Sequence, residues 1–317
     1  METELDLLTI GDCSIDMFME LDKDFVSTEY EGQKLEICFF HGSKVPVESF
    51  GTSIAGNACN VAVAATKLGL KTGIYTELGE DAYGDRIINE MAEQGIDTSS
   101  CIKNPGTPTN VHAIVVHAGD RTIFSYHEPR DYKIHYWPKP KWIFYSSLAK
   151  GFDEFQAQLV IYLKEHPDVA VAFNPGTQQL REGLPALKNI LEMVSVLFVN
   201  TQEAQMILST EETDLLTLHK KLQELGPKLT VITLADKGST AFDGKKLMEE
   251  GIYDDAAPIV DKTGAGDSYA AGFIAALFYG KPLKEAMRWG SINSSGVIRK
   301  IGAIQGLRTK KEIEAVL

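Results

Sequence analysis

Apolar residues in the second half of the chain follow two alternating periods. Short apolar runs predict buried strands at residues 142–146, 169–173, 196–199 and 229–234. The segments around them carry apolar residues at helical spacing and predict helices at residues 153–165, 187–193, 201–208 and 213–225. Strands that alternate with helices predict an α/β fold, in which helices cover both faces of a mostly parallel sheet. Ligands bind such sheets beyond the carboxyl ends of the strands.

The first half begins with the same alternation and then departs from it. The pattern predicts strands at residues 5–10 and 72–76 and helices at residues 56–69 and 85–94. Two further segments show strand-like alternation without a helical partner, and we expect them to form a small antiparallel sheet. One interpretation of this sheet is a lid. The alternative is an insertion or an oligomer contact without such a role. The predicted division is therefore a main α/β domain of residues 1–16, 51–107 and 138–317 and a β lid of residues 17–50 and 108–137.

Composition and charge narrow the classes of function. The chain has 317 residues, with 31 Lys and Arg against 44 Asp and Glu, and a formal net charge of −13. This excess of negative charge argues against binding to nucleic acid or to anionic lipid. No apolar run approaches the roughly 20 residues that span a bilayer, and the first residues lack the basic flank of a signal peptide. Because the four cysteines form no C-x-x-C pair, we expect a cytoplasmic protein with reduced thiols.

The strongest chemical signal is the segment D-K-T-G-A-G-D, from Asp261 to Asp267, which precedes an apolar helix. Gly264, Ala265 and Gly266 allow a tight turn, whose N–H groups form an anion site together with the positive end of the helix dipole. Asp267 comes beside these groups and can accept a proton while they hold developing negative charge. The alternative is an Asp-capped helix after a glycine turn.

Other polar residues follow predicted strands. Asn200 ends an apolar run, and Glu203 comes one turn into the next helix, where it can order a hydrated Mg²⁺. The alternative for this pair is a capping box. Asp16 follows the first strand, while Gly56 and Asn60 open the first helix. Carboxylate and amide groups there suit a ligand with several hydroxyl groups, although turns use these residue types in any case.

A competing set of motifs has less support. S-x-x-K at residues 147–150 and K-T-G at residues 262–264 occur in the order found in serine acyl-transfer enzymes of the penicillin-binding type. The S-D-N motif that such enzymes carry is missing, so we do not favour this interpretation. The Walker motif G-x-x-x-x-G-K-[ST] is also missing, which argues against a P-loop NTPase.

Taken together, the motifs resemble the ribokinase-like, PfkB-type family of carbohydrate and nucleoside kinases. The family signature D-T-x-G-A-G-D matches residues 261–267, with Lys262 in place of the first Thr. The N-terminal signature G-G-x-x-x-N matches residues 55–60, with Ala55 in place of the first Gly. Three further family motifs are similar to segments of this chain, namely N-x-x-E at residues 200–203, T-L-G-x-x-G at residues 233–238 and N-P at residues 174–175.

This resemblance implies a fold, an activity and a set of roles. The implied fold is a ribokinase-like three-layer α/β sandwich with a mostly parallel central sheet and a small β-sheet lid. Asp267 is expected to be the general base, and the N–H groups of residues 264–266 are expected to hold the transferring phosphoryl group. Substrate contacts are expected from Asp16, Gly56 and Asn60. Contacts to ATP and Mg²⁺ are expected from Asn200, Glu203, Thr233 and Gly238, with Lys237 as a further positive charge.

The resemblance also implies a cation site and leaves alternatives. Asp261 and Thr263, with the loop near Gly302, resemble the monovalent-cation site of many members, which suits K⁺. The leading hypothesis is a kinase for a hydroxyl of a small sugar. The first alternative is a nucleoside kinase, in which Phe39, Phe40, Phe124 and Tyr126 stack on a base. The second is a catalytically silent sugar-binding protein.

Two expectations concern the lid. We expect a homodimer formed through the lid, because lid sheets of this family often pair. The lid segment from His127 to Arg130 either contacts the substrate or forms a solvated turn.

Overall fold

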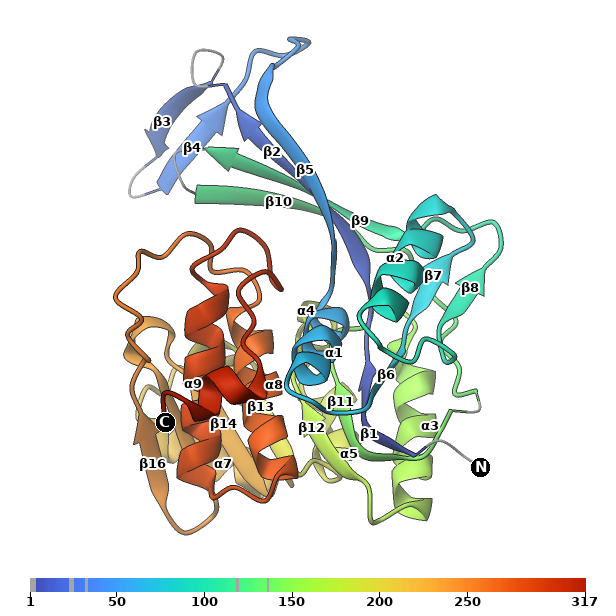
Figure 1. Ribbon diagram of the computed structural model, residues 1–317, viewed down its shortest axis with the longest axis vertical. Coiled ribbons are helices and arrows are strands. Elements are labelled where there is room, and N and C mark those ends of the chain that lie inside the picture. Colours follow the sequence, from blue (N-terminus) through green and yellow to red (C-terminus); the bar gives the residue numbers. More distant parts are fainter. Residues whose placement is uncertain (1–3, 23–25, 32–33, 118–119, 136) are drawn as a thin grey trace.

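The computed structural model describes residues 4–22, 26–31, 34–117, 120–135 and 137–317. Its main body is built on an eight-stranded sheet with the order β16-β15-β14-β13-β12-β11-β1-β6, and a second sheet projects above it (Figure 1). The strands of the main sheet are β1 (Leu5–Ile10), β6 (Thr72–Tyr75), β11 (Pro140–Tyr145), β12 (Ala170–Phe173), β13 (Val196–Asn200), β14 (Leu229–Thr233), β15 (Ser239–Phe242) and β16 (Leu247–Glu250). Across this sheet, each neighbouring pair from β6 through β1, β11, β12 and β13 to β14 is parallel. At the other edge, β15 pairs antiparallel with both β14 and β16.

Helices cover both faces of this sheet, so the body has three layers. The helices are α1 (Asn57–Lys67), α2 (Ala82–Glu93), α3 (Phe152–Glu165), α4 (Thr177–Glu182), α5 (Leu184–Leu191), α6 (Thr201–Leu208), α7 (Leu215–Glu224), α8 (Ala265–Phe278), α9 (Leu283–Val297) and α10 (Lys310–Glu314). One hydrophobic core joins the sheet to α1, α8 and α9, and the other joins it to α3, α5, α6 and α7. The predicted α/β fold with a mostly parallel sheet is confirmed.

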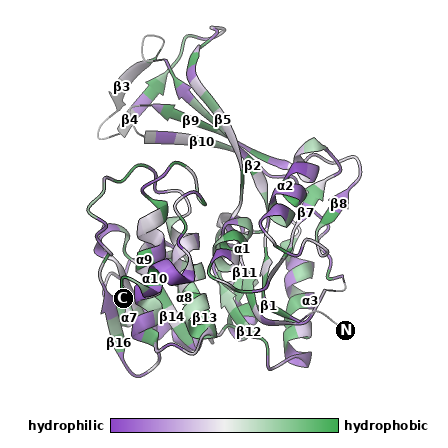
Figure 2. Ribbon diagram, viewed as in Figure 1, coloured by the Kyte–Doolittle hydropathy of each residue, from purple (hydrophilic) through white to green (hydrophobic). Residues whose placement is uncertain are grey.

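Period-two alternation along each strand explains why there are two cores. In β13, Val196 and Phe198 face the α8 side, while Leu197 and Val199 face the α3 side. Because both faces are buried, the strands are continuous hydrophobic runs, and Figure 2 shows them as mostly hydrophobic ribbons in the middle of the body. Within the described residues, no helix is both long and apolar enough to cross a membrane.

The second sheet, called the lid sheet below, has the order β10-β9-β2-β5. Its strands are β2 (Ser14–Leu21), β5 (Val47–Ala55), β9 (Asn110–His117) and β10 (Asp120–Tyr126). The sheet is mixed, because β2 and β9 run parallel while the other two pairs are antiparallel. The prediction of an antiparallel sheet was therefore wrong for that pair. The two strands enter the sheet from separate parts of the chain, so no hairpin turn forces them to be antiparallel.

Two small sheets complete the fold. A hairpin of β3 (Ser27–Glu31) and β4 (Lys34–Cys38) lies beyond the lid sheet, and β7 (Glu77–Gly79) pairs with β8 (Ile102–Asn104) beside α2 (Figure 1). Of the segments predicted as lid, residues 23–25, 32–33, 118–119 and 136 lie outside the described residues. Residues 1–3 of the predicted main domain also lie outside them.

Candidate active site

A cavity of about 370 Å³ lies between the carboxyl ends of the central strands and the lid sheet. It brings together residues from distant parts of the chain, from Asp16 to Asp267. The residues that line it and that the sequence had singled out are Asp16, Gly56, Asn60, Asn174, Asn200, Glu203, Thr233, Lys262, Thr263, Gly264, Ala265, Gly266 and Asp267. The cavity therefore lies where ligands bind in parallel α/β sheets.

The segment from Lys262 to Asp267, called the catalytic turn below, ends in the first turn of α8. Gly264 is the N-cap residue and has a φ of 74°, which only glycine adopts at little cost. A Cβ at this position would also lie 2.6 Å from the Cβ of Ala303, so the turn is packed too closely for a side chain. In contrast, a Cβ at Gly266 would have no protein atom within 4 Å, because this position faces the cavity.

The N–H groups of the catalytic turn are not all free. The N–H of Ala265 donates to the carbonyl oxygen of Lys262 at 3.3 Å, which closes the turn. Those of Gly264 and Gly266 have no acceptor among the residues that the structure describes. Free N–H groups at a helix N-terminus attract anions, so these two are suited to hold phosphate oxygens.

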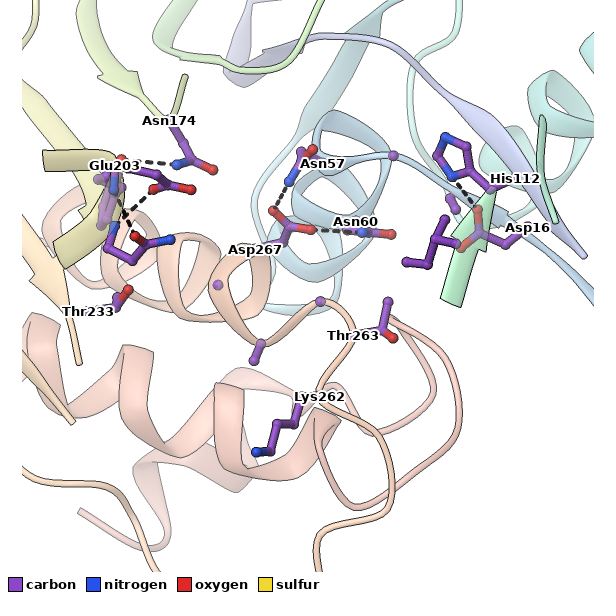
Figure 3. Close-up of a pocket in the computed structure, with 18 of the residues that line it drawn as sticks. Asp16, Asn57, Asn60, His112, Asn174, Glu203, Thr233, Lys262, Thr263 and Asp267 are labelled. Carbon is purple, nitrogen blue, oxygen red and sulfur yellow. Dashed lines mark hydrogen bonds and ion pairs between the residues drawn. The ribbon is translucent and has the colours of Figure 1, made fainter. Parts of the chain in front are cut away.

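Two amide side chains hold the carboxylate of Asp267, as Figure 3 shows. Asn57 Nδ2 donates to one oxygen at 2.8 Å, and Asn60 Nδ2 donates to the other, also at 2.8 Å. Both asparagines come from the first turn of α1, where a spacing of three residues places them on one face. Asp267 is only 6% exposed, and this burial raises its pKa, while the hydrogen bonds from Asn60 and Asn57 oppose the rise. The arrangement produces an oriented carboxylate with raised basicity.

The start of α1 requires glycine for its own reason. Gly56 is the N-cap residue of α1 with a φ of 116°, and a Cβ there would lie 2.3 Å from the carbonyl oxygen of Asp12. This contact brings the first turn of α1, and with it Asn57 and Asn60, close to the loop after β1. Asn60 Oδ1 is buried and has no hydrogen-bond partner in the described structure, so one acceptor remains for a ligand.

Asn200 and Glu203 form the capping box that was the alternative interpretation of this pair. Asn200 Oδ1 accepts from the N–H of Glu203 at 2.9 Å, and Glu203 Oε2 accepts from the N–H of Asn200 at 2.8 Å. Both residues nevertheless line the cavity, so capping and ligand binding are compatible. Burial raises the pKa of Glu203, the Asn200 N–H opposes the rise, and the charge of Asp267 adds to it. A carboxylate near Asp267 is a suitable place for a divalent cation.

The lid sheet contributes a second carboxylate. Asp16 lies within β2 and not in a loop after the first strand, as the sequence had indicated, because β2 already begins at Ser14. Its Oδ1 lies 2.9 Å from His112 Nδ1 and accepts from Ser14 Oγ at 3.4 Å. His112 Nε2 in turn lies 3.2 Å from His127 Nε2, which places this part of the 127–130 segment beside the cavity wall.

The rest of that segment is structural. Arg130 is buried, and its guanidinium donates to Thr107 Oγ1 at 2.5 Å and to the carbonyl oxygen of Pro108 at 2.6 Å.

Asp12, which comes four residues before Asp16, is a buried carboxylate outside the cavity wall. It accepts from the Tyr132 hydroxyl at 2.7 Å and from the N–H of Ala149 at 2.8 Å. Burial raises the pKa of Asp12 to about 7, against the effect of these hydrogen bonds.

Several residues singled out from the sequence do not line this cavity. Gly238 closes the turn before β15, where it has a φ of 89° and a Cβ would lie 2.1 Å from the carbonyl oxygen of Glu250. Lys237 and Asp261 are also absent from the cavity wall, and Asp261 lines a neighbouring cavity. The four aromatic residues proposed to stack on a base are absent from the wall as well, with Phe40 90% and Phe124 59% exposed.

Among the residues of the cavity wall that sequence reasoning missed are Asn57, His112, Arg121 and Ile123. Asn57 had a signal, because it lies three residues before Asn60 in the motif that had been singled out. The other three are single residues on β9 and β10 with no motif around them. Only the pairing of the lid strands brings them to the cavity.

A search of the described residues finds no cluster of three or more His, Cys, Asp or Glu side chains that could hold a metal ion. A structural zinc site of that kind is therefore absent from the described part of the chain. Mg²⁺ needs no such cluster, since it is bound by one or two carboxylates together with water and substrate phosphates. Glu203 fits this requirement, because Asn200 engages only one of its carboxylate oxygens.

Comparison with known proteins identifies the family. The model of the pfkB family of carbohydrate kinases matches residues 9–310. An ATP-dependent 6-phosphofructokinase of Thermoanaerobacterium thermosaccharolyticum is 23% identical, over 96% of this chain and 92% of that protein. A nucleoside kinase of Methanothermobacter thermautotrophicus is 26% identical, over 95% of this chain and 92% of that protein. The matched family is one of carbohydrate kinases, which are phosphotransferases that use an alcohol group as acceptor. The chain belongs to the pfkB family of carbohydrate kinases.

Solved structures show the same fold. The structure of Arabidopsis thaliana ribokinase, complexed with ribose and ATP, matches with a TM-score of 0.82 and covers 99% of both chains at 21% identity. The predicted ribokinase-like architecture is thus confirmed. The interpretation as a serine acyl-transfer enzyme is wrong, because both the family and the fold are those of kinases.

Proposed function

We propose that this protein is an ATP-dependent kinase that transfers the γ-phosphate to a hydroxyl group of a small sugar, with Asp267 as the general base. The observation that carries the proposal is the position of Asp267. Its buried carboxylate is oriented by Asn57 and Asn60 and shares one cavity with the free N–H groups of Gly264 and Gly266. A proton acceptor thus adjoins an anion site, as phosphoryl transfer requires.

The residues divide the reaction between them. Asp267 accepts the proton of the substrate hydroxyl as the hydroxyl oxygen forms a bond to the γ-phosphorus and the bond from that phosphorus to the β,γ-bridging oxygen breaks, which releases ADP. The N–H groups of Gly264 and Gly266 and the dipole of α8 stabilise the negative charge on the transferring group. Because Asn57 and Asn60 fix both oxygens of Asp267, little reorientation is needed at the moment of transfer.

Glu203 is the residue that we assign to Mg²⁺, and Asn200 and Thr233 line the same part of the cavity toward ATP. Mg²⁺ supplies charge neutralisation on the phosphates when it is bound. Gly238 and Lys237 stay predicted ATP contacts, since they lie outside this cavity wall. The predicted homodimer through the lid and the cytoplasmic location also stay predictions. A requirement for K⁺ is not part of the proposed function, because the guanidinium of Arg121 already contacts Asp261 and Thr263, the residues that resemble the cation site.

The lid side of the cavity favours a sugar over a nucleoside. It presents Asp16 and His112, which can hydrogen-bond to hydroxyl groups, and the aliphatic side chains of Ala55 and Ile123. The aromatic residues that would stack on a base are not among the described residues that line this cavity. The relatives include a ribokinase and a nucleoside kinase, so the family does not distinguish the two substrates. The preference for a sugar therefore rests on the residues of the cavity wall.

The first experiment replaces the base. Asp267→Asn keeps the size of the side chain and removes its ability to take a proton. We expect kcat to fall on the order of 10²-fold or more, with a folded protein and a similar thermal midpoint. The measurement is ADP release and sugar phosphate formation, with the substrate that a thermal-shift screen identifies. A variant with nearly wild-type kcat contradicts the role of Asp267.

The substrate is found by a thermal-shift screen followed by product analysis. The screen contains ribose, fructose, ketodeoxy sugars, adenosine, cytidine and inosine, each with and without a non-hydrolysable ATP analogue and Mg²⁺. Ligands that bind the folded state raise the unfolding midpoint. We expect a sugar to raise it and to be phosphorylated. Stabilisation by nucleosides alone would overturn the choice of a sugar, and sugar binding without product would support a silent protein.

A further inference from the structure

An arginine of the lid sheet reaches the segment that leads into the catalytic turn. Arg121 lies on β10, and its guanidinium donates to Asp261 Oδ1 and to Thr263 Oγ1. The partners are 140 and 142 residues apart in the chain. Arg121 also lines both the cavity of Asp267 and a neighbouring cavity of about 470 Å³ between the lid sheet and residues 301–305. The contact therefore spans the space between the lid and the body.

The carboxylate of Asp261 is surrounded by hydrogen-bond donors. Its Oδ1 accepts from the N–H of Thr263 at 2.9 Å and from the Thr263 hydroxyl at 2.6 Å, in addition to Arg121. Its Oδ2 accepts from the N–H of Gly302 at 2.9 Å. Burial opposes ionisation of Asp261, but these hydrogen bonds and the Arg121 charge outweigh it and hold the pKa below its ordinary value. Asp261 is thus an ionised carboxylate whose counter-charge is a guanidinium.

This arrangement does not fit a monovalent cation. Such a cation is held by oxygen atoms that replace its water shell. Here the oxygens of Asp261 are already used by four donors, and the Thr263 hydroxyl donates to Asp261 and receives from Arg121. A second positive charge next to the guanidinium would in addition be repelled by it. The residues that resemble a K⁺ site therefore hold an internal cation in this chain.

We propose that the guanidinium of Arg121 takes the place of a monovalent cation beside the catalytic turn, and that it does so only while the lid sheet covers the cavity. The proposal rests on the proposed kinase function. Arg121 acts as a positioning residue, through Asp261 and Thr263, on Gly264, which follows Thr263 and is the N-cap residue of α8. Movement of the lid sheet away from the body removes this charge, so the turn reaches its phosphate-binding geometry when the lid is closed.

The proposal differs from a bound ion in what it predicts. A K⁺ ion would stabilise the turn in every lid position and would make the enzyme respond to the choice of salt. A guanidinium on β10 makes the wild-type enzyme indifferent to K⁺ and couples the turn to the lid. Loss of the guanidinium leaves Asp261 without its counter-charge, which opens the carboxylate to an added cation.

The test compares Arg121→Met with a matched variant, Arg86→Met. Arg86 also links the body to a lid strand, since it donates from α2 to Thr52 of β5 and pairs with Glu90, but it does not line the cavity of Asp267. Thermal unfolding is followed in KCl, NaCl and choline chloride at equal ionic strength, without turnover. Steady-state rates are measured in the same salts with ATP, Mg²⁺ and the sugar identified above.

We expect the wild-type and Arg86→Met midpoints and rates to be the same in KCl and NaCl. For Arg121→Met we expect a rate about tenfold or more lower in NaCl, with part of it restored in KCl, and a midpoint that rises specifically in KCl. Arg121→Lys, which keeps a positive charge, is expected to remain indifferent to K⁺ and serves if Arg121→Met does not fold.

Two outcomes overturn the proposal. One is a K⁺-specific rise in the wild-type midpoint or rate, whatever the variants do. The other is an Arg121→Met protein that matches Arg86→Met in every salt. Because the unfolding measurement needs no turnover, it decides the role of Arg121 even if no sugar is phosphorylated, and the two proposals can therefore fail separately.

Discussion

The catalytic turn and the lid sheet face each other across one cavity and are held in different ways. The turn is fixed by backbone packing, because Gly264 lies against Ala303 and the following residues of α8 are buried in the core. The lid sheet reaches the core that contains α8 only near its base, through residues such as Ile15 of β2 and Ile54 of β5. Most of β5 is exposed, and the contacts that reach the body include side-chain hydrogen bonds from Arg121 to Asp261 and from Arg86 to Thr52.

This difference indicates a division of labour. Packing fixes the backbone of the turn around Gly264, so the turn depends on the lid sheet chiefly through the contact of Arg121 with Asp261 and Thr263. Side-chain contacts can be broken and remade at small cost, which is consistent with the predicted role of this sheet as a lid. A change in the turn should therefore reduce the chemical step, whereas a change in the lid sheet at a position other than Arg121 should chiefly reduce substrate binding.

The largest effect is expected in the catalytic turn, at Gly264. Gly264→Ala combines a positive φ with a methyl group 2.6 Å from the Cβ of Ala303. We expect a loss of roughly 1–3 kcal/mol of unfolding free energy and a fall in kcat on the order of 10²-fold. Denaturant unfolding and steady-state kinetics measure the two effects.

Gly266→Ala is the matched control for this prediction. Its added methyl group meets no protein atom within 4 Å but enters the cavity. Stability should therefore be unchanged or slightly higher, since alanine favours a helix, while activity still falls. If both variants were equally stable, tight packing at Gly264 would not be what positions the turn.

A smaller effect is expected in the lid sheet, at Asp16. Asp16→Asn keeps the volume of the side chain but loses the charged acceptor for substrate hydroxyl groups. A hydrogen bond to a charged group contributes about 2 kcal/mol, so KM for the sugar should rise roughly thirtyfold with little change in kcat. Ser14→Ala removes the long contacts of its hydroxyl to Asp16 Oδ1 and His112 Nδ1, both at 3.4 Å, and should change KM far less. A fall in kcat with unchanged KM would contradict the division between lid and turn.

The smallest effect is expected at Asn57, and it depends on pH. The Asn57 amide opposes the burial that raises the pKa of Asp267, so Asn57→Ala should raise this pKa further. Because the base must be ionised, the acid limb of the kcat profile should move to higher pH. The loss of activity, about tenfold near the acid limb, should then shrink as pH rises.

Asn104→Ala is the control for the pH profile. Asn104 is also half-buried and donates to a carboxylate, Glu77 Oε2, at 3.0 Å, but it does not line the cavity. Its removal should leave the acid limb where it is in the wild-type protein. An unshifted profile in Asn57→Ala would show that the amide orients Asp267 without tuning its protonation.

The sequence predicted the body better than the lid. Strands such as 196–199 are continuous apolar runs because both of their faces are buried, and this signal is local. The parallel pairing of β2 with β9 carries no local signal, because it depends on how two distant segments meet. The same holds for the site, where Asp267 and Glu203 belong to motifs, while His112 and Arg121 are single residues in lid strands.

By itself, the sequence determined the α/β architecture and predicted a glycine turn with a candidate base beside it, because periodicity and glycine placement express them over a few consecutive residues. Only the tertiary structure decided what surrounds each group. It placed the amides of Asn57 and Asn60 on Asp267, 210 and 207 residues away, and a guanidinium on Asp261. Burial, charge pairing and pKa depend on atoms within a few ångströms, and the chain brings those atoms together only when it folds.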